Sequence, residues 1–415
     1  MHSVMLPSYR PRLIDPLLER LLAEVPAVLL VGPRAAGKTT TAARHARAVV
    51  HLDREAEAVA FRADPDAALR GLTEPVLLDE WQVVPSVLGA LKRSVDRDPR
   101  PGRFLVTGSV RADLEAEGWP ATGRLIRLPL YGMTIREQLG AMDGPTLLDR
   151  IVAGDEPAAP AELPDLRDYV ELALRSGFPE PALRLSSEAR QRWLESYVDQ
   201  VLTRDVALVD GIRDPARLRR YAEAFALNSA GVVDERTLLD AAGVSRSTAT
   251  AYERLLVNLL LIELVPAWTT SRLRRLVLSP KRYLVDPALL AGLVRVDVAA
   301  VMRDGDLLGR LLDTFVVAQI RGELALSAAR PRLYHLRQEQ GRHEIDLLAE
   351  LGAERVVAFE VKATAAPAAD DARHLGWLRD RLGDRFVAGV VFHTGPRPFR
   401  LGDRIAALPI CAFWA

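Results

Sequence analysis

Short apolar runs alternate with helical patterns in the first third of the chain. Between the runs, residues 38–48 and 55–61 carry apolar side chains at helical spacing. The runs themselves are rich in Val, Ile and Leu and are short enough for buried strands. Alternation of strands and helices predicts an α/β layer with a mainly parallel sheet. The candidate strands are residues 28–31, 49–52, 76–78, 104–107 and 125–130.

The pattern changes twice in the remainder of the chain. Residues 142–164 are rich in Pro, Ala, Gly and Asp, which indicates a linker. After it the pattern is mostly helical, most clearly at 188–209 and 217–228. An α/β pattern then returns, with a helix at 307–326 followed by strands at 332–337, 344–350, 356–362 and 387–393. We therefore expect domains at residues 1–141, 165–300 and 301–415, with the linker at 142–164.

Composition narrows the class of protein. A chain of 415 residues is too long for one ordinary core, and its 49% apolar and 27% charged residues are typical of a globular protein. The 55 basic and 55 acidic residues cancel, so net charge points to no nucleic-acid or membrane partner. A single cysteine, Cys411, excludes an internal disulfide, and no apolar run approaches the roughly 20 residues that span a bilayer. These features predict a cytoplasmic protein without a membrane partner.

The first candidate site is a glycine-rich loop after the first predicted strand. Residues 32–39, GPRAAGKT, fit the pattern G-x-x-x-x-G-K-[ST], with a strand before them and a helical pattern after them. In such a loop backbone N–H groups surround phosphates, the lysine reaches the terminal phosphates and the hydroxyl ligates Mg²⁺. The alternative is a chance glycine-rich turn. The candidate phosphate-binding residues are Gly32, Pro33, Arg34, Ala35, Ala36, Gly37, Lys38, Thr39 and Thr40.

Acidic residues follow the third predicted strand. Asp79 and Glu80 end an apolar run, which places them at the carboxyl edge of the sheet beside the phosphate loop. There Asp79, with Thr39, would hold Mg²⁺, and Glu80 would orient the attacking water as a base. The plainer interpretation is a solvated strand end.

Two further residues are candidates for catalysis. Thr107 ends the next strand, where its hydroxyl could contact the attacking water or the last phosphate, or could belong to an ordinary turn. Arg124 is a candidate transition-state arginine, supplied within the chain or to a neighbouring copy in a homo-oligomer.

Residues 235–256 have helix-turn-helix character. Gly243 makes the turn and Ser245 is a good N-cap for the second helix. Two strand-like runs at 262–267 and 275–278 would form a wing. The second helix would reach a major groove, while basic side chains near the wing would contact phosphates. Such modules also mediate protein contacts or join domains. The candidate DNA-contacting residues are Arg246, Ser247, Thr248, Thr250 and Arg254, with Arg272, Arg274, Arg275, Lys281 and Arg282 near phosphates.

A nuclease-like constellation lies near the C-terminus. Asp346 lies on one predicted strand, and Glu360 and Lys362 lie on the next, where period-two alternation puts both on one face. Two carboxylates that share Mg²⁺ beside a lysine would suit phosphodiester cleavage, and Asp313 on the preceding helix could add a third acid. The alternatives are charged strand faces or an inactive relic.

Together these motifs resemble a family of prokaryotic AAA-type P-loop ATPases. VLLVGPRAAGKTT, VLLDEWQ, FLVTGS, HEIDLL and FEVKAT match its segments over nearly the whole chain. The resemblance implies an ATPase domain with ATP and Mg²⁺, a helical winged-helix middle domain and a C-terminal α/β restriction-endonuclease-like domain. One departure is Asp313, where the family usually carries glutamate.

Three functions remain open from the sequence. The first is a Mg²⁺-dependent ATPase whose nucleotide cycle controls a C-terminal module that binds DNA or another partner. The second is an ATP-gated, metal-dependent DNA nuclease that uses Asp346, Glu360 and Lys362. The third is a non-enzymatic regulator that binds DNA or protein and has ATP as a structural ligand.

Overall fold

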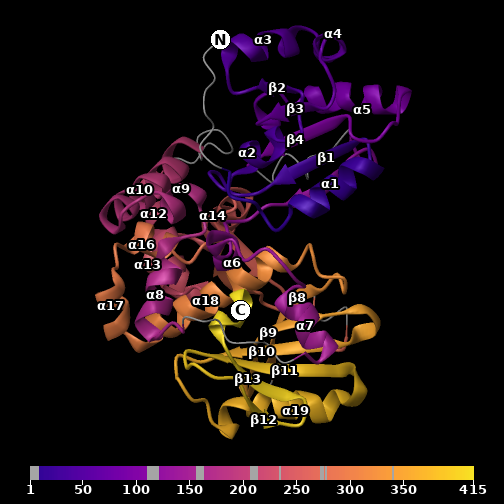
Figure 1. Cartoon of the computed structure of the whole chain (residues 1–415). Coiled ribbons are helices and arrows are strands. Elements are labelled where there is room, and N and C mark those ends of the chain that lie inside the picture. Colours follow the sequence, from indigo (N-terminus) through magenta and orange to yellow (C-terminus); the bar gives the residue numbers. More distant parts are fainter. Residues whose placement is uncertain are drawn as a thin grey trace. The chain divides into compact units, whose positions relative to one another are not determined.

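Figure 1 shows the chain, for which the computed structural model describes residues 9–109, 121–155, 163–205, 214–232, 235–271, 275, 278–338 and 341–415. One unit comprises the described residues up to Gly132 together with Asn258–Leu260, and the other comprises Met133–Val257 and Leu261–Ala415. The boundary at Gly132 lies before the predicted one at residue 141. The predicted middle and C-terminal domains belong to a single compact unit.

The first unit is a parallel α/β layer. Its sheet has the strand order β2-β3-β4-β1-β5, and each strand is parallel to its neighbours. The predicted parallel sheet is thus confirmed, with small shifts at the strand ends. The strands are β1 Ala27–Val31, β2 Ala48–His51, β3 Val76–Asp79, β4 Phe104–Gly108 and β5 Ile126–Pro129. The helices are α1 Asp15–Glu24, α2 Lys38–Ala43, α3 Glu55–Ala63, α4 Pro65–Arg70 and α5 Val87–Arg97.

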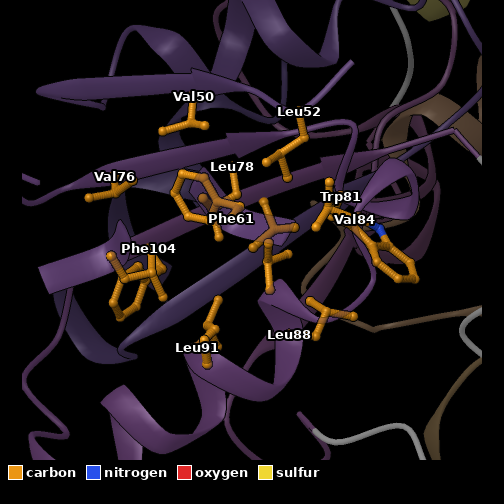
Figure 2. Packing of buried hydrophobic residues seen from close by; sticks show 14 of the residues in the cluster. Val50, Leu52, Phe61, Val76, Leu78, Trp81, Val84, Leu88, Leu91 and Phe104 are labelled. Atoms are coloured by element: carbon orange, nitrogen blue, oxygen red, sulfur yellow. The ribbon is translucent and has the colours of Figure 1, made fainter. Parts of the chain in front are cut away.

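Both faces of this sheet are buried, as the near-continuous apolar strands require. Figure 2 shows one face, where Val76, Leu78 and Phe104 of the strands pack with Leu88 and Leu91 of α5. On the other face, alternate strand residues pack against α1 and α2. Helix α2 ends before the predicted residue 48 because that residue already pairs in β2.

The second unit combines many helices with a six-stranded mixed sheet. The sheet order is β12-β13-β11-β10-β9-β8, with β10, β11 and β13 parallel to one another. Its helices are α6 Ile135–Leu139, α7 Leu147–Ala153, α8 Leu166–Arg175, α9 Pro179–Leu183, α10 Ser187–Gln200, α12 Pro215–Leu227, α13 Glu235–Ala242, α14 Arg246–Asn258, α16 Leu289–Val294, α17 Val298–Arg303, α18 Gly305–Glu323 and α19 Arg373–Leu382. Its strands are β6 Ile262–Val265, β7 Lys281–Leu284, β8 Arg332–Gln338, β9 His343–Glu350, β10 Val356–Val361, β11 Phe386–His393, β12 Phe399–Gly402 and β13 Ile405–Pro409.

The segment predicted as a linker contains structure. Helix α7 lies within residues 142–164, and its Leu147, Leu148 and Ile151 are buried in the second unit. These apolar residues pack with Phe359 and Phe392 of the mixed sheet. The Pro- and Ala-rich composition concealed them, so the linker prediction is wrong for α7. Residues 156–162 lie outside the described part of the chain.

One prediction about the wing also needs correction. The strand that pairs with β6 is β7, in antiparallel register from Ile262↔Leu284 to Val265↔Lys281, rather than residues 275–278. The chain between the strands also joins the mixed sheet, because Ala267 forms a parallel bridge with His335 of β8. The backbone there is therefore built onto the C-terminal sheet. Arg272, Arg274 and residues 276–277 lie outside the described residues.

Candidate functional site

The loop at residues 32–39 leaves the carboxyl end of β1, as predicted for a phosphate loop. Gly37 has a φ of 94°, a left-handed conformation that glycine adopts without steric cost. At Gly32 a Cβ would lie 1.8 Å from the carbonyl oxygen of Leu130, so only glycine fits there. Arg34, Ala35 and Thr40 are exposed, whereas the remaining loop residues are buried or half-buried.

Lys38 begins α2 and is buried in the loop. Its Nζ donates to the carbonyl oxygen of Pro33 at 2.8 Å. Burial lowers the pKa of Lys38 to about 8, although the nearby carboxylates of Glu80 and Asp79 partly offset this effect. The ammonium group thus lies in a desolvated loop where an anionic ligand would stabilise its charge.

Asp79 joins the loop to two neighbouring strands. Its Oδ1 accepts a hydrogen bond from the Thr39 hydroxyl at 2.7 Å and another from the Thr107 hydroxyl. Its Oδ2 lies 3.1 Å from Nδ1 of His51, which occupies the paired position at the end of β2. The structure therefore brings the two predicted Mg²⁺ ligands, Thr39 and Asp79, into direct contact. Hydroxyl and carboxylate oxygens are the hard ligands that Mg²⁺ prefers, so these residues fit the ion.

Glu80 follows Asp79 in a left-handed conformation, with a φ of 55°. A glutamate in this region costs roughly 1–2 kcal/mol, and such residues cluster at functional sites. Its Oε2 accepts from the amide of Gln82 and from the Ser109 hydroxyl, the latter at 3.2 Å. These contacts hold the carboxylate at the carboxyl edge of the sheet.

Thr107 has a different place from the one predicted. It is fully buried, and its hydroxyl donates to Asp79 and accepts from the backbone N–H of Glu80. These contacts position the acidic pair. Ser109, two residues further on, is the hydroxyl that contacts the Glu80 carboxylate.

Arg124 lies at the opposite edge of the sheet from the phosphate loop. Strands β5 and β1 are parallel, with Ile126 beside Val28, so a residue before Ile126 is at the amino edge. The Arg124 Nε donates to Asp96 at the end of α5 at 2.7 Å. A catalytic role for Arg124 within its own chain is therefore not supported.

Sequence reasoning missed four residues that support this site. The buried Arg12 donates from its two terminal nitrogens to the carbonyl oxygens of Ala36 in the loop and of Tyr131, each at 2.8 Å. No motif marks this long-range contact. His51 and Ser109 could have been found, because both stand at carboxyl ends of strands in the sheet. Gln82 belongs to the quoted VLLDEWQ segment but gave no chemical signal by itself.

A second cluster of charged groups lies in the second unit. Lys281 of β7 lies 2.7 Å from Oδ2 of Asp313 and 2.9 Å from Oδ1 of Asp346. Glu360 and Lys362 form a separate ion pair at 3.2 Å, consistent with one strand face. Among the described residues, no group of three or more His, Cys, Asp or Glu side chains is arranged to hold a metal ion.

A polar cleft of about 530 Å³ opens beside this cluster. Asp313, Asp346 and Lys362 line it, together with Arg310 and Arg337. Glu360 is buried and is not among the residues that line the cleft, and burial raises the pKa of its carboxyl group well above the usual value. Three of the four predicted C-terminal site residues therefore share one cleft.

Three of the five basic residues predicted near the wing form internal ion pairs, and the other two, Arg272 and Arg274, lie outside the described residues. Arg275 is buried against Glu350 at 2.8 Å, and Arg282 donates to Glu253 at 2.6 Å. Lys281 is paired as described above. On α14, Ser247, Thr250 and Arg254 are exposed, as predicted.

Comparisons with known proteins identify an AAA domain over the residues that include the phosphate loop. An AAA domain family matches residues 24–139, and two domain families of unknown function, DUF8612 and DUF4143, match residues 166–299 and 308–413. The first unit thus contains an AAA-type P-loop domain. Uncharacterized proteins of Mycobacterium bovis and Mycobacterium tuberculosis are each 31% identical over 398 residues, which covers 94% of this chain and 82% of each relative. The chain belongs to the family of these mycobacterial proteins.

A solved structure, the Walker-type ATPase PABY2304 of Pyrococcus abyssi, is 13% identical in sequence to this chain. The match covers 68% of this chain and 94% of the Pyrococcus chain. Its TM-score of 0.41 is too low to support an argument about the fold. None of the described helices combines the length and apolar character that crossing a bilayer requires.

Proposed function

We propose that this chain is a Mg²⁺-dependent ATPase whose catalytic site is the carboxyl edge of the first sheet. The hydrogen bond of 2.7 Å between the Thr39 hydroxyl and Asp79 carries the proposal. It joins the two groups that ligate Mg²⁺ in P-loop enzymes, one in the first turn of α2 and the other at the end of β3. The AAA family match over residues 24–139 supports ATP as the nucleotide.

Each residue of the site has a distinct task in this proposal. Lys38 binds the terminal phosphates, and its desolvation favours an anionic ligand. Glu80, held by Gln82 and Ser109, orients the attacking water. Mg²⁺ held by Thr39 and Asp79 would neutralise charge that develops on the phosphates.

The direct test is Lys38→Ala, assayed by phosphate release with ATP and Mg²⁺. We expect a loss of at least 100-fold, which is typical for removal of one charge-stabilising group. Lys92→Ala is the matched control, because Lys92 is an exposed lysine of α5 paired with Asp96. Unchanged turnover in folded Lys38→Ala protein would reject the proposal.

A second variant separates catalysis from binding. Glu80→Gln should bind a fluorescent ATP analogue normally but hydrolyse ATP slowly, because the amide cannot accept the proton from water. Glu55→Gln, at an exposed glutamate paired with Arg62, is the control. If the unmodified chain hydrolyses ATP no faster than Glu80→Gln, ATP is a structural ligand of a regulator instead.

For the module that the nucleotide cycle controls, we propose a winged helix that contacts duplex DNA through α14. Helices α12, α13 and α14 followed by the β6–β7 hairpin support this, as do the exposed Arg254 and Thr250. Arg275, Lys281 and Arg282 form internal ion pairs, so among the described basic residues of this module those of α14 are the better candidates for contact. Duplex binding that weakens with salt and is lost in Arg246→Ala/Arg254→Ala would support the proposal. Retention of a protein partner without DNA binding would instead indicate protein recognition.

The nuclease alternative has weaker support. Asp313, Asp346 and Lys362 share a cleft, but Lys281 lies between the two aspartates. The test is incubation of the purified chain with plasmid, ATP and Mg²⁺ or Mn²⁺. Nicking that disappears in Asp346→Ala would revive this alternative.

A further inference from the structure

Lys281 occupies the position between the two carboxylates that a bridging metal would require. It is the first residue of β7 and is 2% exposed. Its Nζ donates to Oδ2 of Asp313 on α18 at 2.7 Å and to Oδ1 of Asp346 on β9 at 2.9 Å. One ammonium group thus binds one oxygen of each acid and connects three elements.

The other oxygens of these two aspartates also accept hydrogen bonds. The Tyr283 hydroxyl donates to Oδ1 of Asp313 at 3.3 Å, and the backbone N–H of Val361 donates to Oδ2 of Asp346 at 3.0 Å. All four carboxylate oxygens therefore have a donor from the protein. Such a fully connected set needs no further cation to satisfy it.

The charge balance agrees with this geometry. Burial acts to lower the pKa of Lys281, but Asp313 and Asp346 outweigh it and raise that pKa well above its ordinary value. Burial likewise acts to raise the pKa of Asp346, but Lys281 outweighs it and the pKa is lowered. Burial raises the pKa of Asp313 to about 6 although Lys281 acts to lower it, so all three groups are mostly charged at neutral pH. A divalent ion within reach of both acids would lie against the ammonium group and be repelled by it.

Glu360 does not supply the missing ligand. Its Oε1 is buried without a hydrogen-bond partner, which is the kind of atom that a bound metal would satisfy. Its Oε2, however, is already paired with a second ammonium group, that of Lys362 at 3.2 Å. The residues present therefore do not fit a divalent metal, in contrast to Thr39 and Asp79.

We propose that Lys281 is a built-in cation that permanently occupies the metal position of the C-terminal domain. The domain therefore binds no divalent ion at Asp313 and Asp346 and cleaves no phosphodiester there. The acids instead serve as anchors that fasten β7 to α18 and β9. This inference does not depend on ATP hydrolysis.

The test is binding of Mn²⁺, measured by electron paramagnetic resonance on the full chain without nucleotide. Asp79→Asn is introduced throughout, so that the phosphate-loop site contributes no ion. We expect no bound Mn²⁺ with Lys281 present, and the gain of a single ion per chain in Lys281→Gln. Asp346→Asn added to Lys281→Gln should abolish that gain. Arg282→Gln is the matched control, because this neighbouring cation pairs with Glu253 and not with the aspartates.

Two outcomes would overturn the proposal. One is Mn²⁺ binding with Lys281 present that disappears in Asp346→Asn. The other is folded Lys281→Gln protein, verified by circular dichroism, that gains no ion. If Lys281→Gln does not fold, the chain with Lys281 present still tests the proposal. Mn²⁺ that binds to this chain and is lost in Asp313→Asn would show that Lys281 does not exclude a metal ion from the aspartates.

Discussion

Each compact unit buries one lysine beside aspartate, yet the two lysines are used in opposite ways. In the first unit Lys38 donates to a backbone carbonyl, and Asp79 accepts from the hydroxyls of Thr39 and Thr107. In the second unit Lys281 donates directly to Asp313 and Asp346. In the first arrangement the Lys38 ammonium group and the Asp79 carboxylate do not pair with each other. The ammonium group can therefore bind a phosphate, and the carboxylate can bind a cation from solution. The second joins them, so that one ammonium group of the protein is shared between two carboxylates.

This difference teaches that residue types alone do not define a metal site. Both sites contain acids, a lysine and a hydroxyl, and both were assigned Mg²⁺ from the sequence. What separates them is the origin of the cation that faces the acids. A neutral hydroxyl can share an acid with Mg²⁺, whereas an ammonium group of the protein competes with it.

The largest expected contrast is between the two key aspartates. Asp79→Asn should lower ATP turnover on the order of 100- to 1000-fold, because it removes a metal ligand of the reacting phosphates. Asp346→Asn should leave turnover within about twofold, because in this proposal the C-terminal acids take no part in the reaction. Steady-state phosphate release with Mg²⁺ measures both, after circular dichroism has verified folding. An equal loss in the two variants would break the comparison.

The second contrast concerns stability. Lys281→Met leaves two buried carboxylates without their cation and should lower the free energy of unfolding by about 3 kcal/mol. Lys38→Met should be neutral or slightly stabilising, because desolvation already disfavours the Lys38 charge, as its pKa of about 8 indicates. Urea unfolding followed by tryptophan fluorescence measures both changes.

The control for these stability measurements is Lys92→Met, at an exposed lysine paired with Asp96. A surface pair of this kind contributes at most about 1 kcal/mol. If Lys38→Met costs as much as Lys281→Met, the two lysines do not differ in the manner inferred.

The first site could largely be predicted from the sequence because its residues belong to short contiguous segments. Residues 32–39 follow one strand and Asp79-Glu80 ends another, and parallel pairing brings the carboxyl ends together. The apolar runs are long enough to fix the strands with small errors at their ends. The sequence did not indicate that Thr107 contacts Asp79 or that Arg12 supports the loop, because both contacts depend on side-chain geometry.

The second site could not be predicted because its decisive residue is distant in sequence. Lys281 lies 32 residues before Asp313 and 65 before Asp346. In a row of basic residues it resembles a phosphate contact, and only the pairing of β7 with β6 turns it toward the acids. Likewise, α7 was hidden by the Pro- and Ala-rich residues around Leu147, Leu148 and Ile151.

A smaller effect concerns pH. Lys38 must be protonated to bind phosphates, and its pKa of about 8 means that protonation is lost as the pH rises through 8. A bound phosphate would raise that pKa, so affinity for ATP should fall about tenfold for each pH unit above 8. Titration of a fluorescent ATP analogue between pH 7 and 9.5 measures this decline. Lys38→Arg should bind with little pH dependence, because arginine stays charged; an equal decline in that variant would assign it to another group.

The smallest expected effect is that of Arg124→Ala. Arg124 lies at the amino edge of the sheet and pairs with Asp96, and the two side chains are 41% and 35% exposed. An exposed pair contributes little to stability, and a residue at the amino edge of the sheet lies away from the phosphate loop at the carboxyl edge. Turnover should therefore change by less than about twofold, as in the control Arg93→Ala, which removes an exposed arginine of α5 paired with Asp66. A larger loss that depends on protein concentration would instead show that Arg124 reaches the phosphates of a neighbouring copy, because an arginine supplied between chains acts only in an oligomer.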